Sequence, residues 1–447
     1  MQANGDGRRV FVIGVGMTKF IPPGKPGNPD YHQLAKQAGL RALHDAGVSY
    51  QDVEQVSCSY VYGDSCSGQR ALYEIGMSGV PVFNVNNNCS SGSTGLYMGY
   101  TLIKGGLHDC VMALGFEKME KGSLKSHFND REGPLSKFTE VVKEVGEFNE
   151  KMPFAPLYFG NAGLEHMKLY GTKPEHFGKV AEKNHRHSAN NPYSQFRDVY
   201  SLDQIMKSPK VFGPLTKLQC CPTSDGAGCV ILASEKFIKE RGLEDQAVEI
   251  LGMVLESDNQ KTFKEKSLMN LVGYEMTGRA AQKLYQKTQI NPNQVQVCEL
   301  HDCFSTNEFI TYEGLGFCEK GKAATFVDAN QNTYGGQVVV NPSGGLISKG
   351  HPLGATGLAQ CSELVWQLRG MAGKRQVENC QLALQHNLGL GGAVVIALYR
   401  KYNKNQSRRT DQTAEPDVLE KLEATGQLLS QKNVQVDSIG SIFRQKL

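Results

Sequence analysis

The sequence predicts an α/β protein made of two similar halves, with a long segment inserted into the first half. Three observations lead to this fold class. Short apolar runs alternate with helical patterns, as in strand–helix–strand units. Stretches of the first half recur in the same order in the second half. The spacing between paired stretches jumps at one place by far more than a connecting loop. A chain of 447 residues is also too long for one ordinary core.

The strand–helix order is clearest in the first half. Short runs rich in β-branched and other apolar residues are predicted as buried strands, at 10–15, 56–61, 80–85, 110–114 and 229–233. A helical pattern covers Tyr31–Ala46 between the first two runs. This alternation predicts a largely parallel sheet.

Four pairs of stretches carry the internal repeat. NNNCSSGSTGL at 86–96 aligns with SKGHPLGATGL at 348–358, with Cys89 opposite His351 at an offset of 351 − 89 = 262. The stretch at 42–56 resembles that at 283–297, with Val48 opposite Ile290 at an offset of 290 − 48 = 242. Two further pairs are 109–114 with 379–384, at an offset of 270, and 226–232 with 390–396, at an offset of 164. Four matches in a consistent order indicate a duplicated domain.

The changes in offset locate the irregular parts of the chain. The second half gains 262 − 242 = 20 residues near 317–340, which we expect to be hairpin-like. The first half holds 270 − 164 = 106 additional residues, about 118–224, which we expect to form a subdomain covering one edge of the sheet. The predicted divisions are 8–117 with 225–250, the insert 118–224, the second half 251–401, and a flexible polar tail at 402–447 with an amphipathic stretch at 418–429.

Composition argues against several classes of function. Lys and Arg number 48 against 45 Asp and Glu, and this net charge of +3 is too small to suggest nucleic-acid binding. No run approaches the roughly 18–20 apolar residues of a membrane helix, and no signal-peptide pattern is present. Because the sequence shows no secretory signal pattern, its twelve cysteines are predicted to be free thiols in a reducing compartment. The final residues QKL differ at one position from the peroxisomal signal SKL, so we expect a peroxisomal or otherwise a cytoplasmic protein.

Cys89 and His351 are predicted to act together. Gly92, Gly95 and Gly99 fall on one face of the helix expected after Cys89, and each weakens that helix by about 1 kcal/mol. We therefore expect them to allow close contact with the helix that follows His351. Cys89 and His351 would then lie at equivalent helix N-termini and face one crevice. Such a position would lower the pKa of the thiol, with His351 taking its proton. The alternative is that both are ordinary structural residues, but their shared sequence context favours the functional reading.

These two stretches resemble loops of the thiolase superfamily. VNNNCSSGS is similar to the nucleophile loop, NPSGGLISKGHPLGATG is similar to the Gly-His-Pro loop, and the resemblance extends over roughly 8–400. Two loops depart from the family pattern. His301-Asp302-Cys303-Phe304 stands where Asn-Glu-Ala-Phe is usual, and Asn387-Leu388-Gly389 stands where a Cys-x-Gly loop is usual. The HDCF sequence is similar to the sterol carrier protein type of thiolase.

The resemblance implies a thiolase-like duplicated five-layer αβαβα fold with an inserted loop domain, and a homodimer. It also implies thiolytic cleavage of 3-oxoacyl-CoA, including 2-methyl-branched and sterol side-chain acyl-CoA, through an acyl-Cys89 intermediate. The products would be acetyl-CoA or propanoyl-CoA and a shortened acyl-CoA. Coenzyme A is expected as a co-substrate. No permanently bound cofactor, metal, nucleic acid or membrane insertion is expected.

The resemblance further implies a role for each site residue. Cys89 would be the nucleophile, His351 its base, and Cys303 the acid/base that replaces the missing second cysteine. His301 and His351 would hold the enolate oxygen, directly or through a water. The backbone N–H groups of Cys89 and Gly389 would hold the other oxyanion. Two further residues are expected to support the site: Asn387 and Asp302.

The other patterns in the sequence are interpreted as structural features rather than as functional sites. VIGVG at 12–16 lacks the third glycine of a dinucleotide-binding turn. Cys298, His301 and Cys303 lack a second spaced pair of ligands, so no metal site is predicted. Cys220 and Cys221 are expected to pack, and His185-Arg186-His187 is expected to form a solvated surface rather than a site for the phosphates of coenzyme A.

Two other functions remain open at this stage. A decarboxylating β-ketoacyl synthase shares the duplicated fold and uses a Cys-His-His set, which Cys89, His301 and His351 would supply. Cys303 argues against it, because decarboxylative condensation does not need a second thiol. A non-catalytic lipid-binding protein on the same fold is the other possibility, although the polar tail is too short to enclose a sterol.

Overall fold

The computed structural model describes residues 7–120, 128 and 130–402, so the amphipathic stretch expected at 418–429 lies outside the described residues. The strands of both halves join one sheet in the order β10-β9-β11-β12-β8-β1-β7-β4-β2-β3. The first half supplies the order β3-β2-β4-β7-β1, and the second half repeats it as β10-β9-β11-β12-β8. This equivalence confirms the duplication predicted from the sequence.

The first half is built from regular elements that the sequence largely anticipated. Its strands are β1 (Val10–Met17), β2 (Gln55–Ser59), β3 (Val82–Val85), β4 (Cys110–Glu117) and β7 (Gly226–Ser234). Its helices are α1 (Tyr31–Ala46), α2 (Ser67–Leu72), α3 (Ser91–Lys104) and α8 (Glu235–Arg241). Helix α1 has the predicted bounds because Asp30 and Gln33 form a capping box at its start and Gly47, at φ 68°, ends it.

The second half repeats these elements. Its strands are β8 (Val248–Glu256), β9 (Val297–Glu299), β10 (Val339–Val340), β11 (Leu382–Gly389) and β12 (Ala393–Lys401). Its helices are α9 (Gln260–Lys264), α10 (Leu268–Leu271), α11 (Tyr274–Thr288), α12 (Ser305–Gly314), α13 (Ala323–Asp328), α14 (Gly345–Lys349) and α15 (Leu353–Arg369). Short 3₁₀ turns occur at Tyr50–Asp52, Lys217–Gln219, Pro292–Gln294 and Gly373–Arg375. The turns that precede β2 and β9 keep the predicted offset, since 292 − 50 = 242.

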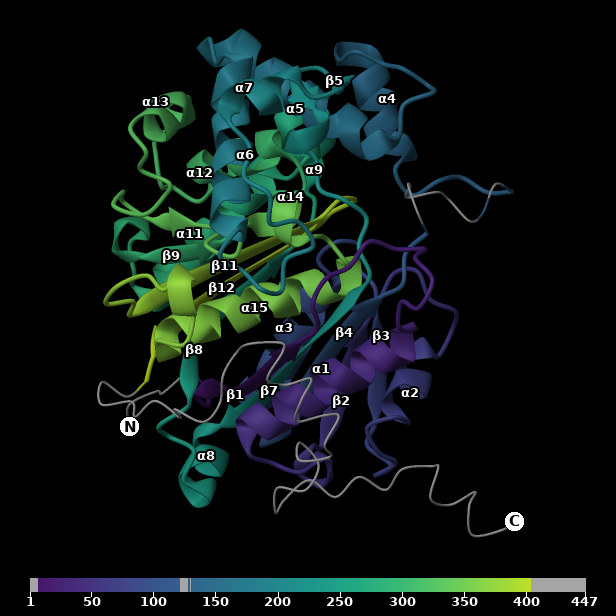
Figure 1. Ribbon diagram of the computed structural model, residues 1–447, viewed down its shortest axis with the longest axis vertical. Coiled ribbons are helices and arrows are strands. Elements are labelled where there is room, and N and C mark those ends of the chain that lie inside the picture. Colours follow the sequence, from purple (N-terminus) through teal and green to yellow (C-terminus); the bar gives the residue numbers. More distant parts are fainter. Residues whose placement is uncertain (1–6, 121–127, 129, 403–447) are drawn as a thin grey trace.

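The helices divide into three layers around the two halves of the sheet (Figure 1). Helix α1 packs on β1, β7 and β4 on the outer face of the first half, and α11 packs on β8 and β12 on the outer face of the second. Helices α3 and α15 contact each other, and α15 contacts strands of both halves. The result is the five-layer αβαβα arrangement. Within the described residues, no helix has both the length and the apolar character needed to cross a membrane.

The prediction of a largely parallel sheet is wrong, because the sheet is mixed. Strand β2 pairs in parallel with β3 and β4, and β9 pairs in parallel with β10 and β11. Strands β7 and β12 are antiparallel to both of their neighbours. The final strand of each half needs no crossover helix, since β12 follows β11 through a tight turn and β7 follows β4 through the insert. A buried strand is apolar on both faces in either direction, so the sequence pattern did not reveal this reversal.

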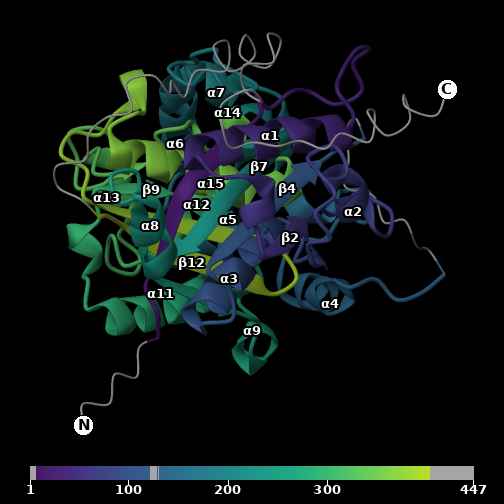
Figure 2. The ribbon, with the colours of Figure 1, turned by 90° about the horizontal axis from the view of Figure 1, so that it is seen from below.

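The segment between β4 and β7 forms helices that pack on the second half of the molecule. It contains α4 (Ser136–Val145), α5 (Phe154–Tyr170), α6 (Pro174–Ser188), α7 (Leu202–Lys207) and the hairpin of β5 (Lys210–Phe212) with β6 (Leu215–Thr216). Helix α5 contacts α10 and α12, and α6 contacts α12, α13 and α14. Helix α4 lies at the edge of the molecule in both views (Figure 2). Residues 317–340 contain α13, turns and the short β10, which pairs in parallel with β9, rather than the expected hairpin.

The crossing of α3 and α15 depends on glycine. A Cβ atom at Gly92 would lie 2.7 Å from the backbone oxygen of Gly354, so the two helix backbones are in direct contact there. The other two glycines predicted at this contact face the sheet instead. A Cβ at Gly95 would meet Ser59 Oγ at 2.5 Å, and one at Gly99 would meet Leu232 Cδ1 at 2.6 Å. Only the first of the three positions therefore serves the helix crossing.

Candidate active site

Cys89 and His351 lie at equivalent places in the two halves. Cys89 stands two residues before the first residue of α3, and His351 stands two residues before the first residue of α15. Because α3 and α15 cross at their N-terminal ends, both side chains reach the same point. The Cys89 sulfur and one ring nitrogen each of His301 and His351 all lie within 4.8 Å of one another.

These side chains open into a cavity of about 500 Å³. Its reactive wall carries Cys89, His301, Cys303 and His351. Apolar side chains also line the cavity, and many come from the segment between β4 and β7: Pro153, Phe154, Ala155, Pro156, Phe159, Phe196, Tyr200, Val211 and Leu218. The structure thus brings the four reactive residues together inside an apolar chamber, where charges interact more strongly than in water.

The hydrogen bonds of His351 make it a base toward the cavity. Its Nδ1 lies 2.7 Å from Thr356 Oγ1, and the Thr356 hydroxyl donates at 3.0 Å to the carbonyl oxygen of Pro352. A carbonyl can only accept, so the hydroxyl must accept the hydrogen of His351 Nδ1. The Nε2 atom then carries a lone pair, and it has no hydrogen-bond partner within the described residues. Burial lowers the pKa of His351 to about 3, which keeps the imidazole neutral.

The resting state of Cys89 differs from the sequence prediction. Burial raises the pKa of the Cys89 thiol to about 12, and the backbone N–H of Leu390 acts in the opposite direction with a smaller effect. The predicted lowering of this pKa is therefore wrong, because removal from water outweighs the helix N-terminus. A neutral thiol beside a neutral imidazole is therefore the resting pair.

His301 has its hydrogen on the opposite ring nitrogen. The Asn387 amide nitrogen Nδ2 lies 3.2 Å from the backbone oxygen of Cys89 and 3.0 Å from His301 Nδ1. The carbonyl fixes the amide orientation, so Nδ2 also donates to His301 Nδ1. The hydrogen of the neutral ring must then sit on Nε2, where it is a donor. Burial lowers the pKa of His301 well below its ordinary value, so the ring stays neutral.

The hydrogen on His301 Nε2 also bears on metal binding. The distances among Cys89, His301 and His351 would suit a metal ion. A metal would need a lone pair from each imidazole, and the hydrogen bond from Asn387 leaves His301 without one at Nε2. The donor set therefore fits acid–base chemistry better than metal ligation.

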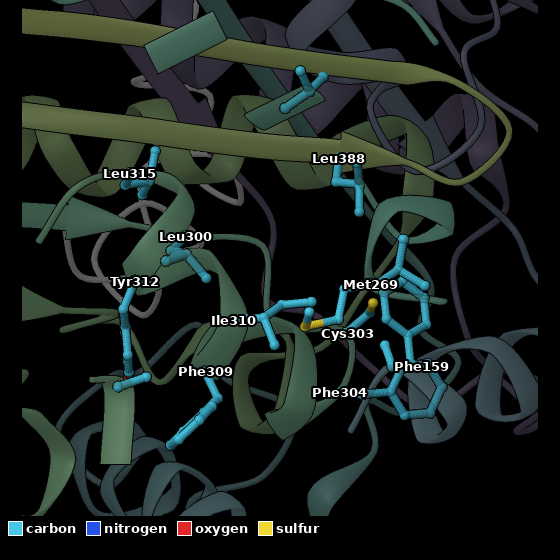
Figure 3. Close-up of a cluster of buried hydrophobic side chains, with 14 of the residues drawn as sticks. Phe159, Met269, Leu300, Cys303, Phe304, Phe309, Ile310, Tyr312, Leu315 and Leu388 are labelled. Atoms are coloured by element: carbon cyan, nitrogen blue, oxygen red, sulfur yellow. The ribbon is translucent and has the colours of Figure 1, made fainter. Parts of the chain in front are cut away.

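Cys303 enters the cavity from the loop between β9 and α12. It lies within an apolar cluster, and Figure 3 shows it beside Met269, Phe304 and Ile310. Burial raises the pKa of the Cys303 thiol well above its ordinary value. The backbone oxygen of Cys303 accepts the N–H of Cys221 at 2.9 Å, so the segment before β7 holds this loop. Cys303 is thus a buried neutral thiol that can donate a proton but is a poor nucleophile at rest.

The remaining predicted residues support the loops rather than line the cavity. Asp302 is fully buried, and its carboxylate accepts the N–H of Leu346 at 2.6 Å and the amide of Asn184 at 2.7 Å. The first bond connects the HDCF loop to α14, just before His351, and the second connects it to α6. Gly389 ends β11, and a Cβ there would meet Asn87 O at 2.2 Å. The next residue, Leu390, lines the cavity beside Cys89 and was missed by the sequence analysis.

The interpretation of His185 and His187 needs correction. His185 and His187 are 2% and 3% exposed, so they do not form a solvated surface. His185 lines the cavity and contacts Ser348 Oγ and Leu218 O, while His187 contacts Asn341 O and Thr333 Oγ1. Their burial was not predicted from the sequence, because the charge pattern of a helix does not show which of its faces another helix covers. Cys220 and Cys221 pack as expected, and both also line the cavity.

Comparison with known proteins identifies the same two halves. The family profile "Thiolase, N-terminal domain" matches residues 10–236, and "Thiolase C-terminal domain-like" matches residues 257–398. "Sterol carrier protein 2" of Rattus norvegicus is 59% identical over 394 residues, which cover 88% of this chain and 72% of the rat protein.

Solved structures share the fold at low sequence identity. An "Ltp2-ChsH2(DUF35) aldolase" matches with a TM-score of 0.72 and 21% identity, over 90% of this chain and 99% of that chain. Human mitochondrial 3-ketoacyl-CoA thiolase, in complex with CoA, matches with a TM-score of 0.65 and 19% identity, over 88% of this chain and 98% of that chain. Similarity at this level establishes the architecture that carries the site.

Proposed function

The chain belongs to the thiolase family and is a 3-oxoacyl-CoA acyltransferase, and we propose that it cleaves its substrate through an acyl-Cys89 intermediate with Cys303 as the second thiol. The observation that carries this proposal is the convergence of Cys89, His301, Cys303 and His351 on one buried cavity. Each of the four has a neutral resting state set by burial, and each can take one step of a thiolytic cleavage.

The first half-reaction forms the acyl-enzyme. The Cys89 sulfur attacks the 3-keto carbon of the substrate while His351 Nε2 takes the thiol proton. The former keto oxygen becomes an oxyanion at the backbone N–H groups of Cys89 and of the Gly389–Leu390 turn. The bond between C2 and C3 then breaks, and its electron pair forms the enolate of the departing thioester. Cys303 gives its proton to C2, which releases acetyl-CoA, or propanoyl-CoA from a 2-methyl substrate, while the shortened acyl group stays on Cys89.

The second half-reaction regenerates the enzyme. The Cys303 thiolate takes the proton of incoming coenzyme A, and the coenzyme A sulfur attacks the acyl carbon on Cys89. The Cys89 sulfur leaves and regains its proton from the His351 imidazolium. His301 Nε2–H, joined by the protonated His351, stabilises the enolate oxygen of the first half-reaction. Every proton is returned, so the cycle needs only coenzyme A as co-substrate.

The apolar walls support bulky acyl chains as substrates. The apolar side chains of Phe154, Phe159 and Val211 line the cavity of about 500 Å³ that also holds the four reactive residues. We propose that 2-methyl-branched and sterol side-chain 3-oxoacyl-CoA substrates bind here, with straight chains also accepted. Cleavage of 2-methyl substrates gives propanoyl-CoA, whereas unbranched ones give acetyl-CoA.

A homodimer is the proposed assembly. Strand β3 ends the sheet, and among the described residues it pairs only with β2. Phe83 on this edge strand is 43% exposed, and an exposed aromatic side chain on a sheet edge favours pairing with another chain. Addition of a second copy at this edge would bury the ring of Phe83 and pair the free edge of β3.

Peroxisomal targeting by the final QKL is also a proposal, which import of a fluorescent fusion with and without Leu447 would test.

The test of the function compares two reactions of three proteins. Parent, Cys89→Ala and Cys303→Ala enzymes are given straight and 2-methyl 3-oxoacyl-CoA with coenzyme A, and separately acyl-CoA with labelled coenzyme A. Cys89→Ala is expected to lose both cleavage and label exchange. Cys303→Ala is expected to lose cleavage by at least about 10²-fold and to lower exchange by less, because exchange needs Cys303 only to move a thiol proton, whereas cleavage also needs it to protonate C2 of the enolate. Cleavage that survives in Cys89→Ala would overturn the proposal.

A decarboxylating ketosynthase is the second candidate, because Cys89, His301 and His351 also form the Cys-His-His set of that reaction. Incubation with malonyl-CoA separates the two functions. Release of carbon dioxide without thiolysis would favour the ketosynthase. We expect thiolysis instead, since Cys303 lies in the same cavity and decarboxylation has no use for it.

A further inference from the structure

A chain of buried hydrogen bonds runs from the core of the second half to His301. Tyr399 Oη donates to Gln385 Oε1 at 2.5 Å, and Gln385 Nε2 donates to Ser93 Oγ at 2.9 Å. Ser93 Oγ donates to Asn387 Oδ1 at 2.8 Å, and Asn387 Nδ2 contacts His301 Nδ1 at 3.0 Å. Tyr399, Gln385, Ser93 and Asn387 are all fully buried.

Backbone carbonyls fix the direction of this chain at two places. Gln385 Nε2 also donates to the oxygen of Gly357 at 2.6 Å, and Asn387 Nδ2 also donates to the oxygen of Cys89 at 3.2 Å. Carbonyl oxygens only accept, so neither amide can be reversed without two donors or two acceptors facing each other. Every hydrogen between Tyr399 and His301 therefore points toward the cavity.

The chain passes through a gap that glycine keeps open. A Cβ at Gly357 would lie 2.1 Å from Ser93 Oγ and 2.7 Å from Asn387 Oδ1. The groups also come from separate parts of the fold, since Ser93 lies on α3, Gly357 on α15, and Gln385 and Asn387 on β11. A simple core contact would not require four polar groups to be satisfied in one direction.

We propose that Ser93, Gln385 and Asn387 are positioning residues that hold His301 with its hydrogen on Nε2, and so make it the donor to the enolate oxygen. This inference rests on the proposed thiolytic function. Hydrogen bonds aligned in one direction strengthen each other in a buried site, so the chain also makes His301 Nε2–H a stronger donor. Loss of an oxyanion donor lowers a rate by about 10²–10³-fold, and a loosened donor lowers it by less.

The decisive variant is Ser93→Ala, because it interrupts the chain without touching the cavity. The rate constant kcat for cleavage of a 3-oxoacyl-CoA is expected to fall by about 10-fold or more. Exchange of labelled coenzyme A into acyl-CoA is expected to stay within about twofold of the parent, because that reaction forms no enolate. A merely structural role would lower both rates together, and that result would overturn the proposal, as would no change in either.

A matched control and a direct observation complete the test. Ser362→Ala removes another fully buried helix hydroxyl, which donates only to Leu358 O on α15, and is expected to keep both rates. Neutron diffraction from the parent protein is expected to place hydrogen on Nε2 of His301 and on Nδ1 of His351. Hydrogen on Nδ1 of His301 would overturn the proposal even if Ser93→Ala does not fold. Absence of cleavage by the parent would instead overturn the proposed function.

Discussion

At the scale of single residues, two neutral imidazoles meet at the site with opposite hydrogen placement. Their ring centres are 5.1 Å apart and nearly perpendicular. Thr356 accepts from Nδ1 of His351, whereas Asn387 donates to Nδ1 of His301. The first ring therefore presents a lone pair and the second a hydrogen. One side-chain type therefore presents both an acceptor and a donor to the cavity because its partners differ.

Substitution Thr356→Val tests the base at this scale. The valine keeps the shape but removes the acceptor of His351 Nδ1–H, so the lone pair is no longer held on Nε2. We expect kcat for cleavage and the rate of coenzyme A exchange to fall together by about 10- to 100-fold, since both begin with proton transfer from Cys89. Loss of cleavage alone would contradict the assignment of His351 as the base for the nucleophile.

At the scale of elements, the close crossing of α3 and α15 sets the distance between sulfur and imidazole. Gly92 is the contact point, since a side chain there would press on the backbone of Gly354. A backbone neighbour cannot rotate away as a side chain can, so the helices would have to separate.

Two Gly→Ala substitutions in helices should have opposite effects. Gly92→Ala is expected to lower the free energy of unfolding by about 1–3 kcal/mol through overpacking. Gly278→Ala in α11 meets nothing closer than 3.8 Å and is expected to raise it by about 0.5–1 kcal/mol through helix propensity. Chemical denaturation of both variants measures this, and equal effects would contradict the role of the crossing.

Glu117, at the end of β4, holds two other segments in place. Its carboxylate is fully buried and accepts the N–H groups of Tyr62 at 2.8 Å and of Gly354 at 2.9 Å. Burial raises the pKa of Glu117 to about 7, although these hydrogen bonds lower it. The first turn of α15 is thus tied to β4 by a group that titrates near neutral pH.

Glu117 should make stability depend on pH. Its pKa is higher in the folded than in the unfolded chain, so between about pH 4.5 and 7 the folded state binds more protons and stability falls as pH rises. The contribution is on the order of 3 kcal/mol. The difference between the unfolding free energies of the parent and of Glu117→Gln is expected to be smaller at pH 8 than at pH 5. Parallel denaturation profiles for the two proteins would contradict this.

At the scale of the whole molecule, the duplication explains where the site lies. Strands β1 and β8, the adjoining edges of the two halves, pair antiparallel from Val10↔Ile250 to Val12↔Val248. The two central helices therefore face each other, and each half supplies one reactive group from the same structural position. The insert then supplies many of the apolar side chains that line the cavity.

The proposed dimer is tested at this scale by Phe83→Lys. A charge on the exposed edge of β3 opposes pairing with a second copy, so a shift toward monomer is expected in sedimentation velocity at micromolar concentration. Leu107→Lys is the matched control, because Leu107 is 70% exposed and lies outside the sheet edge. A dimer that withstands Phe83→Lys would place the interface elsewhere.

Much of the fold was predictable because its causes are local. The bounds of α1 follow from its capping box and its C-terminal Gly47, and the five strands of the first half follow from their apolar runs. Strand direction was not predictable, since a buried strand reads the same in both directions. The burial of His185 and His187 was missed because it depends on contacts with distant segments.

The sequence by itself determined the duplicated architecture and the pairing of Cys89 with His351, because similar stretches that recur in the same order carry that information directly. Only the tertiary structure decided the charge and hydrogen placement within the site. The thiol pKa depends on how completely the surrounding fold removes water, and the hydrogen on His301 depends on Asn387, 86 positions away along the chain, and through it on Ser93, 294 positions from Asn387. Solvation and hydrogen-bond direction are properties of the packed interior, so no local pattern of residues encodes them.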